Sequence, residues 1–210
     1  MKNYSNTSRK GSKGFTLVEL LVVITIIVTL MAILIPVVGS VQRNAIKTKA
    51  KNSLTSLVTS VDLYYNTYNV LPSNTRSAPS EDEEVETTEP IMSILAGINL
   101  DGLNKKEQIF FTGDVAKGKT RASAYNGLRL DSTSAELYSP WKMKGKLAGG
   151  IRGYILLLDY GYDEKLDNPF DDGQVIPRRA IAWSAGKDGR FTRGLNPKAD
   201  KNEDNVYSWF

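Results

Sequence analysis

Apolar residues are concentrated in one long run near the N-terminus. From Phe15 to Val38 the sequence is almost unbroken Val, Ile, Leu, Thr and Ala. At about 1.5 Å per helical residue, a run of this length can cross a hydrocarbon core of about 30 Å. The sequence therefore predicts a transmembrane helix over residues 15–38.

After this run the apolar positions become periodic, which predicts that the helix continues outside the membrane over residues 39–72. Pro72 disfavours helical geometry at Leu71 and marks the end of this helix. The apolar face is formed by residues spaced mostly three or four apart: Val41, Ala45, Leu54, Val58, Val61, Tyr65 and Tyr68.

The remaining residues, 73–210, are expected to form one globular head. An acidic stretch over 73–90 contains no basic residue except Arg76 and is expected to be an exposed loop. The apolar spacing of residues 90–100 predicts a short helix. Residues 150–159 and 174–183 read as two antiparallel strands joined by a polar loop over 161–173. A long helix followed by a small sheet gives an α+β fold.

Two residues in the apolar run are unusual for a simple anchor. Glu19 places a carboxylate where an ionised group costs at least a few kcal/mol without a partner, so it is a candidate functional residue. Pro36 removes a backbone donor and is expected to kink or loosen the helix.

The residues from Lys13 to Glu19, Lys-Gly-Phe-Thr-Leu-Val-Glu, resemble the processing site of type IV prepilins and type II secretion pseudopilins. The resemblance implies that a prepilin peptidase removes a leader peptide of residues 1–14 by cutting after Gly14 and methylates Phe15. In that register Glu19 is the acidic fifth residue of the family and Pro36 is the twenty-second, a position where these helices often carry proline. The pilin fold that this implies, a long helix and a small antiparallel sheet, agrees with the hydrophobic pattern.

The resemblance also implies a role for Glu19 in assembly. In a helical filament of identical subunits, the new amino group of one subunit is thought to lie beside the Glu of its neighbour, so that two buried charges offset one another. A secretory signal peptide is disfavoured because its apolar core should span only about 7 to 15 residues. A simple membrane anchor explains the apolar length but neither Glu19 nor the Gly14–Phe15 junction.

Charge and composition restrict the partners. The chain has 27 basic and 23 acidic residues, and four of the basic ones, Lys2, Arg9, Lys10 and Lys13, lie in the leader. The mature chain is therefore nearly neutral, and no nucleic-acid partner is evident. Because a basic flank stays cytoplasmic, the head is expected outside the bacterial inner membrane, in the periplasm or on the cell surface. Lipid surrounds the helix before assembly, and the resemblance implies an inner-membrane assembly platform as a further partner.

The stripe of Arg43, Lys47 and Lys51 beyond the membrane is either a solvated helix face or a contact for lipid headgroups or an acidic patch on a neighbouring subunit. The sequence has no cysteine and no histidine, so it lacks a disulfide framework, thiolate chemistry and the commonest general base. These absences make most hydrolase mechanisms improbable, and the chain is not expected to be an enzyme.

Two short motifs suggest catalysis. Residues 113–120 satisfy the phosphate-loop pattern of a nucleotide hydrolase, but Asn126-Gly127 would end the required helix after barely two turns. The Ser184-x-x-Lys187 pattern of acyl-serine enzymes contains Gly186, which disfavours the helix that this chemistry needs. We interpret the Ser-x-x-Lys pattern as a chance match and keep the phosphate loop as an alternative that the topology disfavours.

The C-terminal stretch is rich in oxygen ligands. An EF-hand is excluded because Asn205 stands in place of the turn glycine and the sequence given stops before the twelfth ligand position. The stretch resembles the C-terminus of the major pseudopilin, which implies Ca²⁺ held by residues matching Asp188, Asp204 and Asn205, with Asp200 and Asn202 as further oxygen donors. Asn205 departs from the acid of the family pattern. In the alternative reading, Asp and Gly merely form turns.

These features together predict a pilin or pseudopilin, a structural subunit of a type IV pilus-like or type II secretion filament assembled through its apolar helix. The alternatives are an uncleaved membrane-anchored binding protein outside the cytoplasm and the phosphate-loop hydrolase.

Overall fold

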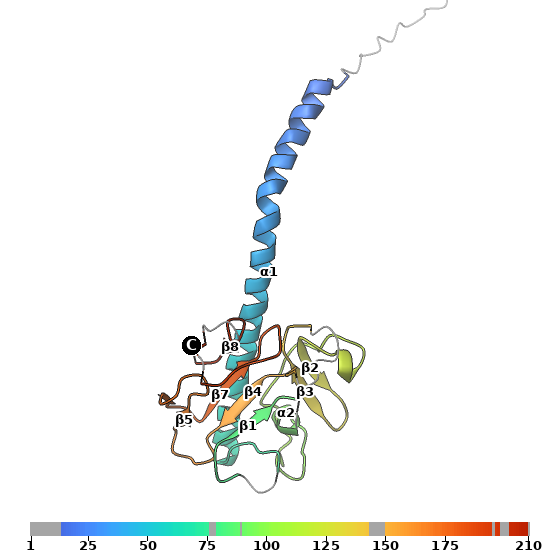
Figure 1. Ribbon diagram of the computed structural model, residues 1–210. Coiled ribbons are helices and arrows are strands. Elements are labelled where there is room, and N and C mark those ends of the chain that lie inside the picture. The colour runs from blue at the N-terminus through green and yellow to red at the C-terminus, as the bar shows by residue number, and fades with distance from the viewer. Residues whose placement is uncertain are drawn as a thin grey trace, which may run out of the picture. The chain divides into compact units, whose positions relative to one another are not determined.

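The computed structural model describes residues 14–75, 79–88, 90–142, 150–194, 196–197 and 202–209. Its internal contacts divide the chain into two compact units, Met1–Asn44 and Ala45–Phe210. Helix α1, Leu17–Tyr68, has residues in both units (Figure 1). Each unit is described by itself below.

The described part of the first unit is helical from Leu17 onward and almost entirely apolar. An 18-residue window of α1 has a mean hydropathy of 3.1, and none of this window is buried. Two hydroxyls in the helix are satisfied locally, because Thr25 donates to the Leu21 carbonyl and Thr29 to the Ile26 carbonyl, at 2.7 and 2.8 Å. By length and composition this helix can cross a membrane, as the sequence predicts.

The second unit, the head, combines the last part of α1 and one short helix with several short strands. Three antiparallel sheets are present among the described residues: a four-stranded sheet in the order β1-β4-β7-β8 and the two-stranded sheets β2-β3 and β5-β6. The elements are α2 (Pro90–Leu95), the 3-10 helix η1 (Arg121–Ser123), β1 (Glu83–Glu86), β2 (Gly127–Leu130), β3 (Ala135–Tyr138), β4 (Ile155–Leu158), β5 (Leu166–Asp167), β6 (Val175–Ile176), β7 (Ala180–Ser184) and β8 (Val206–Tyr207).

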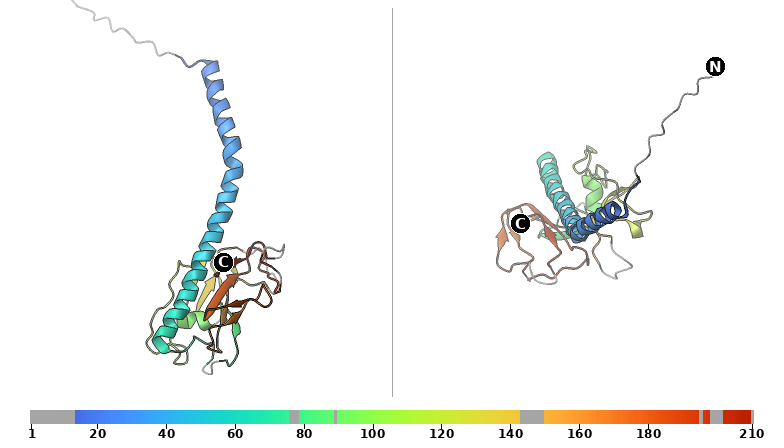
Figure 2. Two further views of the ribbon diagram at one scale, coloured as in Figure 1. Left: turned by 90° about the vertical axis from the view of Figure 1, so that its left-hand side faces the viewer. Right: turned by 90° about the horizontal axis from the view of Figure 1, so that it is seen from above.

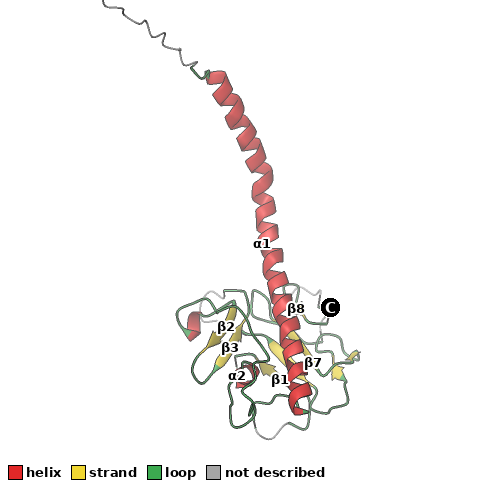
Figure 3. Cartoon of the chain, turned by 180° about the vertical axis from the view of Figure 1, so that it is seen from behind, coloured by secondary structure: helices red, strands yellow, loops and turns green. Residues whose placement is uncertain are grey.

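The four-stranded sheet is buried on both faces, so its central strands carry apolar residues at successive positions. Leu156 and Leu158 of β4 belong to the cluster formed with α1, whereas Ile155 and Leu157 belong to the cluster on the other face. Figure 3 shows the head portion of α1 lying across the sheet. Strand β4 is therefore a continuous apolar run rather than an alternating one.

The cluster on the second face is mainly aromatic. Trp183 of β7 is fully buried, and Phe170 packs edge-on against it with ring centroids 5.6 Å apart. Tyr207 of β8 also contacts Phe170 edge-on at 4.8 Å. Because these rings come from three separate segments, the cluster joins the C-terminal stretch to the sheet.

Most elements confirm the sequence predictions, and two differ. Helix α1 ends at Tyr68. The next residue, Asn69, adopts a left-handed φ of 55°, and its N–H donates the last helical hydrogen bond to the Tyr65 carbonyl. The short helix expected over residues 90–100 is α2, which ends at Leu95. The α+β class is confirmed.

The first difference concerns the acidic stretch, which was expected to be an exposed loop throughout. Residues 83–86 instead form β1, paired with β4, and the Val85 side chain is only 1% exposed. The strand was not predicted because three of its four residues are glutamates and only one, Val85, is apolar. The glutamates also suit an edge strand, because charged side chains discourage pairing with another chain.

The second difference concerns the predicted strand over 174–183. It is divided into β6 and β7 by Pro177 and the two arginines that follow, and β6 pairs with β5 instead of β4. The antiparallel pairing of residues 155–158 with 180–183 is as expected. The loop between them therefore contains a small hairpin of its own.

Candidate functional site

The junction expected to be processed lies just before the first turn of α1. Gly14 and Phe15 are not helical, and Phe15 is 73% exposed. A Cβ atom added at Gly14 would meet nothing within 4 Å. In the described structure the Gly14–Phe15 peptide bond is thus open to an external enzyme.

Thr16 and Glu19 together close the N-terminus of α1. The Glu19 carboxylate accepts hydrogen bonds from the Thr16 backbone N–H at 2.9 Å and the Thr16 hydroxyl at 2.8 Å. In return, the Glu19 N–H donates to the Thr16 hydroxyl oxygen at 3.3 Å. This reciprocal arrangement is a capping box, which satisfies donors that a helix start leaves free.

The capping box gives Glu19 a local function in the single chain. Its carboxylate is held by two donors of its own chain, which lowers the cost of placing it at a membrane. The sequence analysis missed Thr16, although the spacing Thr-x-x-Glu before an apolar run is the signal of such a box. Pro36 lies within α1, but its side chain is outside the described residues, so the expected kink stays a prediction.

The C-terminal loop begins at Gly186, two residues after the last residue of β7, Ser184. The Asp204 carboxylate accepts a hydrogen bond from the Lys187 backbone N–H at 2.5 Å and another from the Asp188 N–H at 3.2 Å. Gly186 has a φ of +65°, and a Cβ there would lie 2.4 to 2.6 Å from the Asp204 carboxylate. Only glycine permits this close approach. The Asp204 carboxylate can therefore bind the two backbone N–H groups of the turn and stabilise it.

The two asparagines of this loop are buried and hydrogen-bonded. Asn202 is fully buried, accepts from the Thr192 N–H and donates to the Thr192 carbonyl, both at 2.9 Å. Asn205, which is 7% exposed, lies with its side-chain nitrogen 3.2 Å from the Asn202 side-chain oxygen. The Asp188 carboxylate accepts from the Arg190 N–H at 2.9 Å. These side chains hold the backbone of the loop.

The structure therefore brings Asp188, Asn202, Asp204 and Asn205 into one loop, while Asp200 lies outside the described residues. The oxygens of Asp188, Asn202 and Asp204 accept hydrogen bonds from backbone N–H groups. No group of three or more Asp and Glu residues that could hold a metal ion occurs in the part of the chain that the structure describes. As folded, the described side chains fit a hydrogen-bonded turn better than a calcium cage. Calcium binding stays a prediction.

Two residues of the basic stripe, Lys47 and Lys51, have an intramolecular role in the head. Lys51 donates from Nζ to the Tyr207 carbonyl at 2.6 Å, and Lys47 to the Glu203 carbonyl at 3.4 Å. Burial, and then the positive charge of Arg178, lower the pKa of Lys51. These two hydrogen bonds connect the C-terminal stretch to α1.

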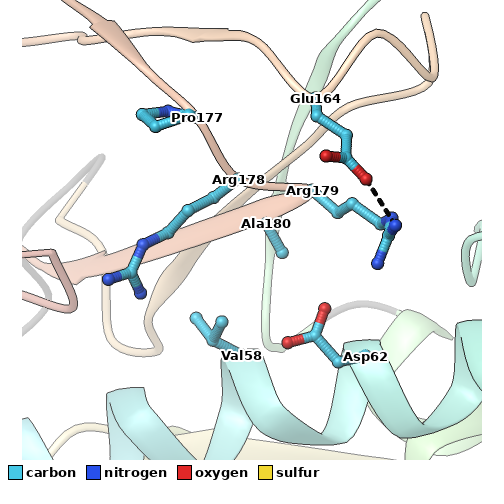
Figure 4. A pocket seen from close by; sticks show the side chains of 7 residues that line it. All are labelled: Val58, Asp62, Glu164, Pro177, Arg178, Arg179 and Ala180. Carbon is cyan, nitrogen blue, oxygen red and sulfur yellow. Dashed lines mark hydrogen bonds and ion pairs between the residues drawn. The ribbon is translucent and has the colours of Figure 1, made fainter.

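A charged cavity of about 300 Å³ lies between α1 and the segment that leads into β7. Figure 4 shows Asp62 of α1 directed toward this segment, while Arg179 forms an ion pair with Glu164. Burial raises the pKa of Asp62, and the positive charges of Arg179 and Arg178 oppose this effect. The cavity is small and open, so we interpret it as a polar contact of the fold and not as a substrate pocket.

Neither catalytic motif has the geometry that its chemistry needs. Residues 109–111 are not a strand, and residues 121–123 form a single 3-10 turn after Thr120 instead of a stable helix. Lys117 pairs with Tyr125 in an isolated bridge. Ser184 is buried at the end of β7, whereas Lys187 is exposed in the following turn. The described residues thus lack the strand, the helix and the side-chain placement that these two mechanisms need.

Comparison with known proteins identifies the N-terminus alone. Residues 9–35 match the family model described as the prokaryotic N-terminal methylation motif. Neither a curated protein nor a solved structure matches the chain. The matched residues include Gly14, Phe15 and Glu19, so the family match and the processing junction coincide.

Proposed function

Because this chain carries the prepilin N-terminal methylation motif of type IV pilin-like proteins, we propose that it is a structural filament subunit. In this proposal a prepilin peptidase cuts after Gly14 and methylates Phe15. The mature chain then leaves the membrane through an assembly platform and packs its apolar helix into a filament. The filament is of the type IV pilus-like or type II secretion kind, in the periplasm or on the cell surface.

One observation carries the proposal. The exposed, non-helical junction at Gly14–Phe15 is followed directly by a capped helix whose large apolar side chains are exposed along its first half. An apolar helix with exposed side chains must be covered by lipid or by other copies. A filament subunit uses both environments in turn.

Processing is tested by intact mass and N-terminal sequencing of the chain from cells with and without the peptidase. We expect a chain that begins at methylated Phe15 only when the peptidase is present. Gly14→Val is expected to remain uncleaved, and because the added side chain would contact nothing in the described structure, its effect reports on the enzyme. A chain that keeps its leader in peptidase-containing cells would instead indicate an uncleaved anchor.

Assembly is tested by Glu19→Ala in the same cells. We expect normal membrane insertion, and cleavage is retained because the Thr16 hydroxyl can still accept from the N–H of residue 19. Filaments should be lost, since the buried amino group of the neighbouring subunit would have no partner. Thr25→Val is the matched control, because it removes a hydroxyl that donates to the Leu21 carbonyl of its own helix. Filaments of normal yield from Glu19→Ala would favour a membrane-anchored binding protein.

A further inference from the structure

One side of the head carries three lysines that form no ion pair within 4 Å among the described residues, although the charge of Lys117 adds to that of Lys49 near Asp114. Lys117 is paired through its backbone with Tyr125, and the Lys142 ammonium lies 5.7 Å from the centre of the Tyr125 ring. Lys119 follows in the turn at Gly118. All three lysines are exposed, and no ion pair involves them within the described residues. We call Lys117, Lys119 and Lys142 the basic wing.

A second surface of the head carries acids that form no ion pair among the residues that the structure describes. Glu81, Asp82 and Glu83 are exposed at the start of β1, and the Gly161 N–H donates to Asp82 at 3.4 Å. Burial raises the pKa of Asp82, and although the Gly161 bond opposes this, the negative charges of Asp159 and Asp163 raise it further. We call Glu81, Asp82, Glu83 and Asp163 the acidic end.

The two surfaces lie at opposite ends of the four-stranded sheet. Glu83 is level with Leu158 at one end of the β1–β4 pair, whereas Thr87, beyond the other end, donates to the Leu137 carbonyl of β3 at 2.8 Å. The β2-β3 hairpin, from which the basic wing extends, is therefore attached at the end remote from Glu83. Figures 1 and 2 show this hairpin and the β5-β6 hairpin on different sides of the sheet.

The head portion of α1 provides a second measure of this separation. Lys49 of α1 forms an ion pair at 2.7 Å with Asp114, just before the basic wing. Tyr65 of α1 packs against Tyr162 beside the acidic end, with ring centroids 6.3 Å apart. Sixteen positions along a helix correspond to about 24 Å. The basic wing and the acidic end therefore lie far apart along the axis of α1 on the same head.

We infer that the basic wing of one copy docks on the acidic end of the next copy along the filament. This inference rests on the proposed function. A contact between two different patches of identical chains is heterologous, and such contacts repeat into open helical assemblies. Complementary charges orient this contact and set its register, and like charges at the wrong register repel.

Charge reversal tests the contact in cells that assemble the wild-type filament. Lys117→Glu with Lys119→Glu, or Glu81→Lys with Glu83→Lys, is expected to lower filament yield about ten-fold or more, because like charges then face one another. Combining all four changes should restore assembly. Full yield from either pair alone, or no restoration in the combination, would overturn the inference, and the latter result would indicate a different occupant for the basic wing.

Cysteine crosslinking provides an independent test, because the chain has no cysteine of its own. A chain with both Lys119→Cys and Glu83→Cys is expected to give a ladder of disulfide-linked multimers in intact filaments, and each single variant none. Glu83→Cys with Lys105→Cys is the matched control, since Lys105 is an exposed lysine outside the basic wing. Equal ladders from the two double variants would refute the contact. Cleaved, assembled filaments without a ladder would refute this contact alone, whereas an uncleaved chain without filaments would refute the proposed function.

Discussion

The Lys51 ammonium donates to the Tyr207 carbonyl at 2.6 Å and so joins helix α1 to the last strand of the sheet. The bond connects residues 156 positions apart. It replaces both interpretations that the sequence left open for this lysine, a solvated face and a contact with another molecule. The positively charged ammonium of Lys51 thus helps to hold the C-terminal stretch against α1.

Lys51→Met is expected to lower the free energy of unfolding by about 1 to 2 kcal/mol, because a charge-assisted bond is lost and a carbonyl is left unsatisfied. Lys47→Met should cost less than half as much, since its bond to Glu203 is 3.4 Å long and exposed. Urea unfolding of the full chain in detergent, followed by tryptophan fluorescence, measures both. Equal losses from the two variants would contradict this assignment.

Gly186→Ala is expected to destabilise the chain by about 2 kcal/mol or more, because it combines a left-handed φ with a clash against Asp204. Gly173→Ala separates the two causes. Gly173 also has a positive φ, of 87°, but a Cβ there would meet nothing within 4 Å. Its cost should therefore be limited to about 1 kcal/mol of backbone strain. Similar midpoints in urea for both variants would show that the close approach to Asp204 is unimportant.

The sequence predicted the helices and the central pairing of residues 155–158 with 180–183 because these depend on local periodicity and continuous apolar runs. It did not predict β1, whose single buried residue, Val85, is flanked by glutamates. That strand exists because β4 offers it an edge, which is a property of the folded sheet. Local pattern cannot show such a partner.

The candidate site likewise has one part that the local sequence indicates and one part that depends on the fold. Gly14, Phe15 and Glu19 could be proposed from seven consecutive residues, because the matched methylation motif is a local sequence. The turn that joins Gly186 to Asp204 could not, since its geometry depends on the sheet that brings these residues together. The sequence indicated Asp188, Asn202, Asp204 and Asn205 as candidate residues of the C-terminal loop, but not the groups that they contact in the fold.

Metal removal tests what closes the C-terminal loop. We expect a chelator to leave the melting temperature of the full chain in detergent unchanged, because the Asp204 carboxylate and the Asn202 amide are held by backbone groups. Asp204→Asn should lower the unfolding free energy by about 1 to 2 kcal/mol with or without chelator. A fall in melting temperature with chelator, reversed by Ca²⁺ but not by Mg²⁺, would establish the calcium site that the sequence predicts.

Asp62 is expected to make stability depend on pH. Because its pKa is raised, the folded state binds the proton more tightly than the unfolded state does. Its contribution to the free energy of unfolding therefore falls as pH rises from the ordinary aspartate pKa, about 3.9, through the folded value. The change in the free energy of unfolding caused by Asp62→Asn should therefore be more favourable at pH 7 than at pH 3. The difference should be less than about 1 kcal/mol, because solvent screens this group.

The control for Asp62 is Asp171→Asn, which changes an exposed aspartate between β5 and β6. We compare each variant with the parent chain by urea unfolding at both pH values. The difference between pH 7 and pH 3 should be larger for Asp62→Asn. An equal or opposite difference would mean that the two arginines beside the cavity outweigh burial.

The capping box at Thr16 is expected to link the start of α1 to processing. Thr16→Val keeps the size of the side chain but removes the hydroxyl that binds Glu19, at a cost of about 1 kcal/mol. This corresponds to about a five-fold loss in the population of the capped helix start. Thr16→Ser retains the hydroxyl and is the control. Because the cap holds the Gly14–Phe15 bond outside the helix, we expect slower cleavage of Thr16→Val in pulse-labelled cells and normal cleavage of Thr16→Ser. Equal rates for the two variants would show that the peptidase does not depend on where the helix begins.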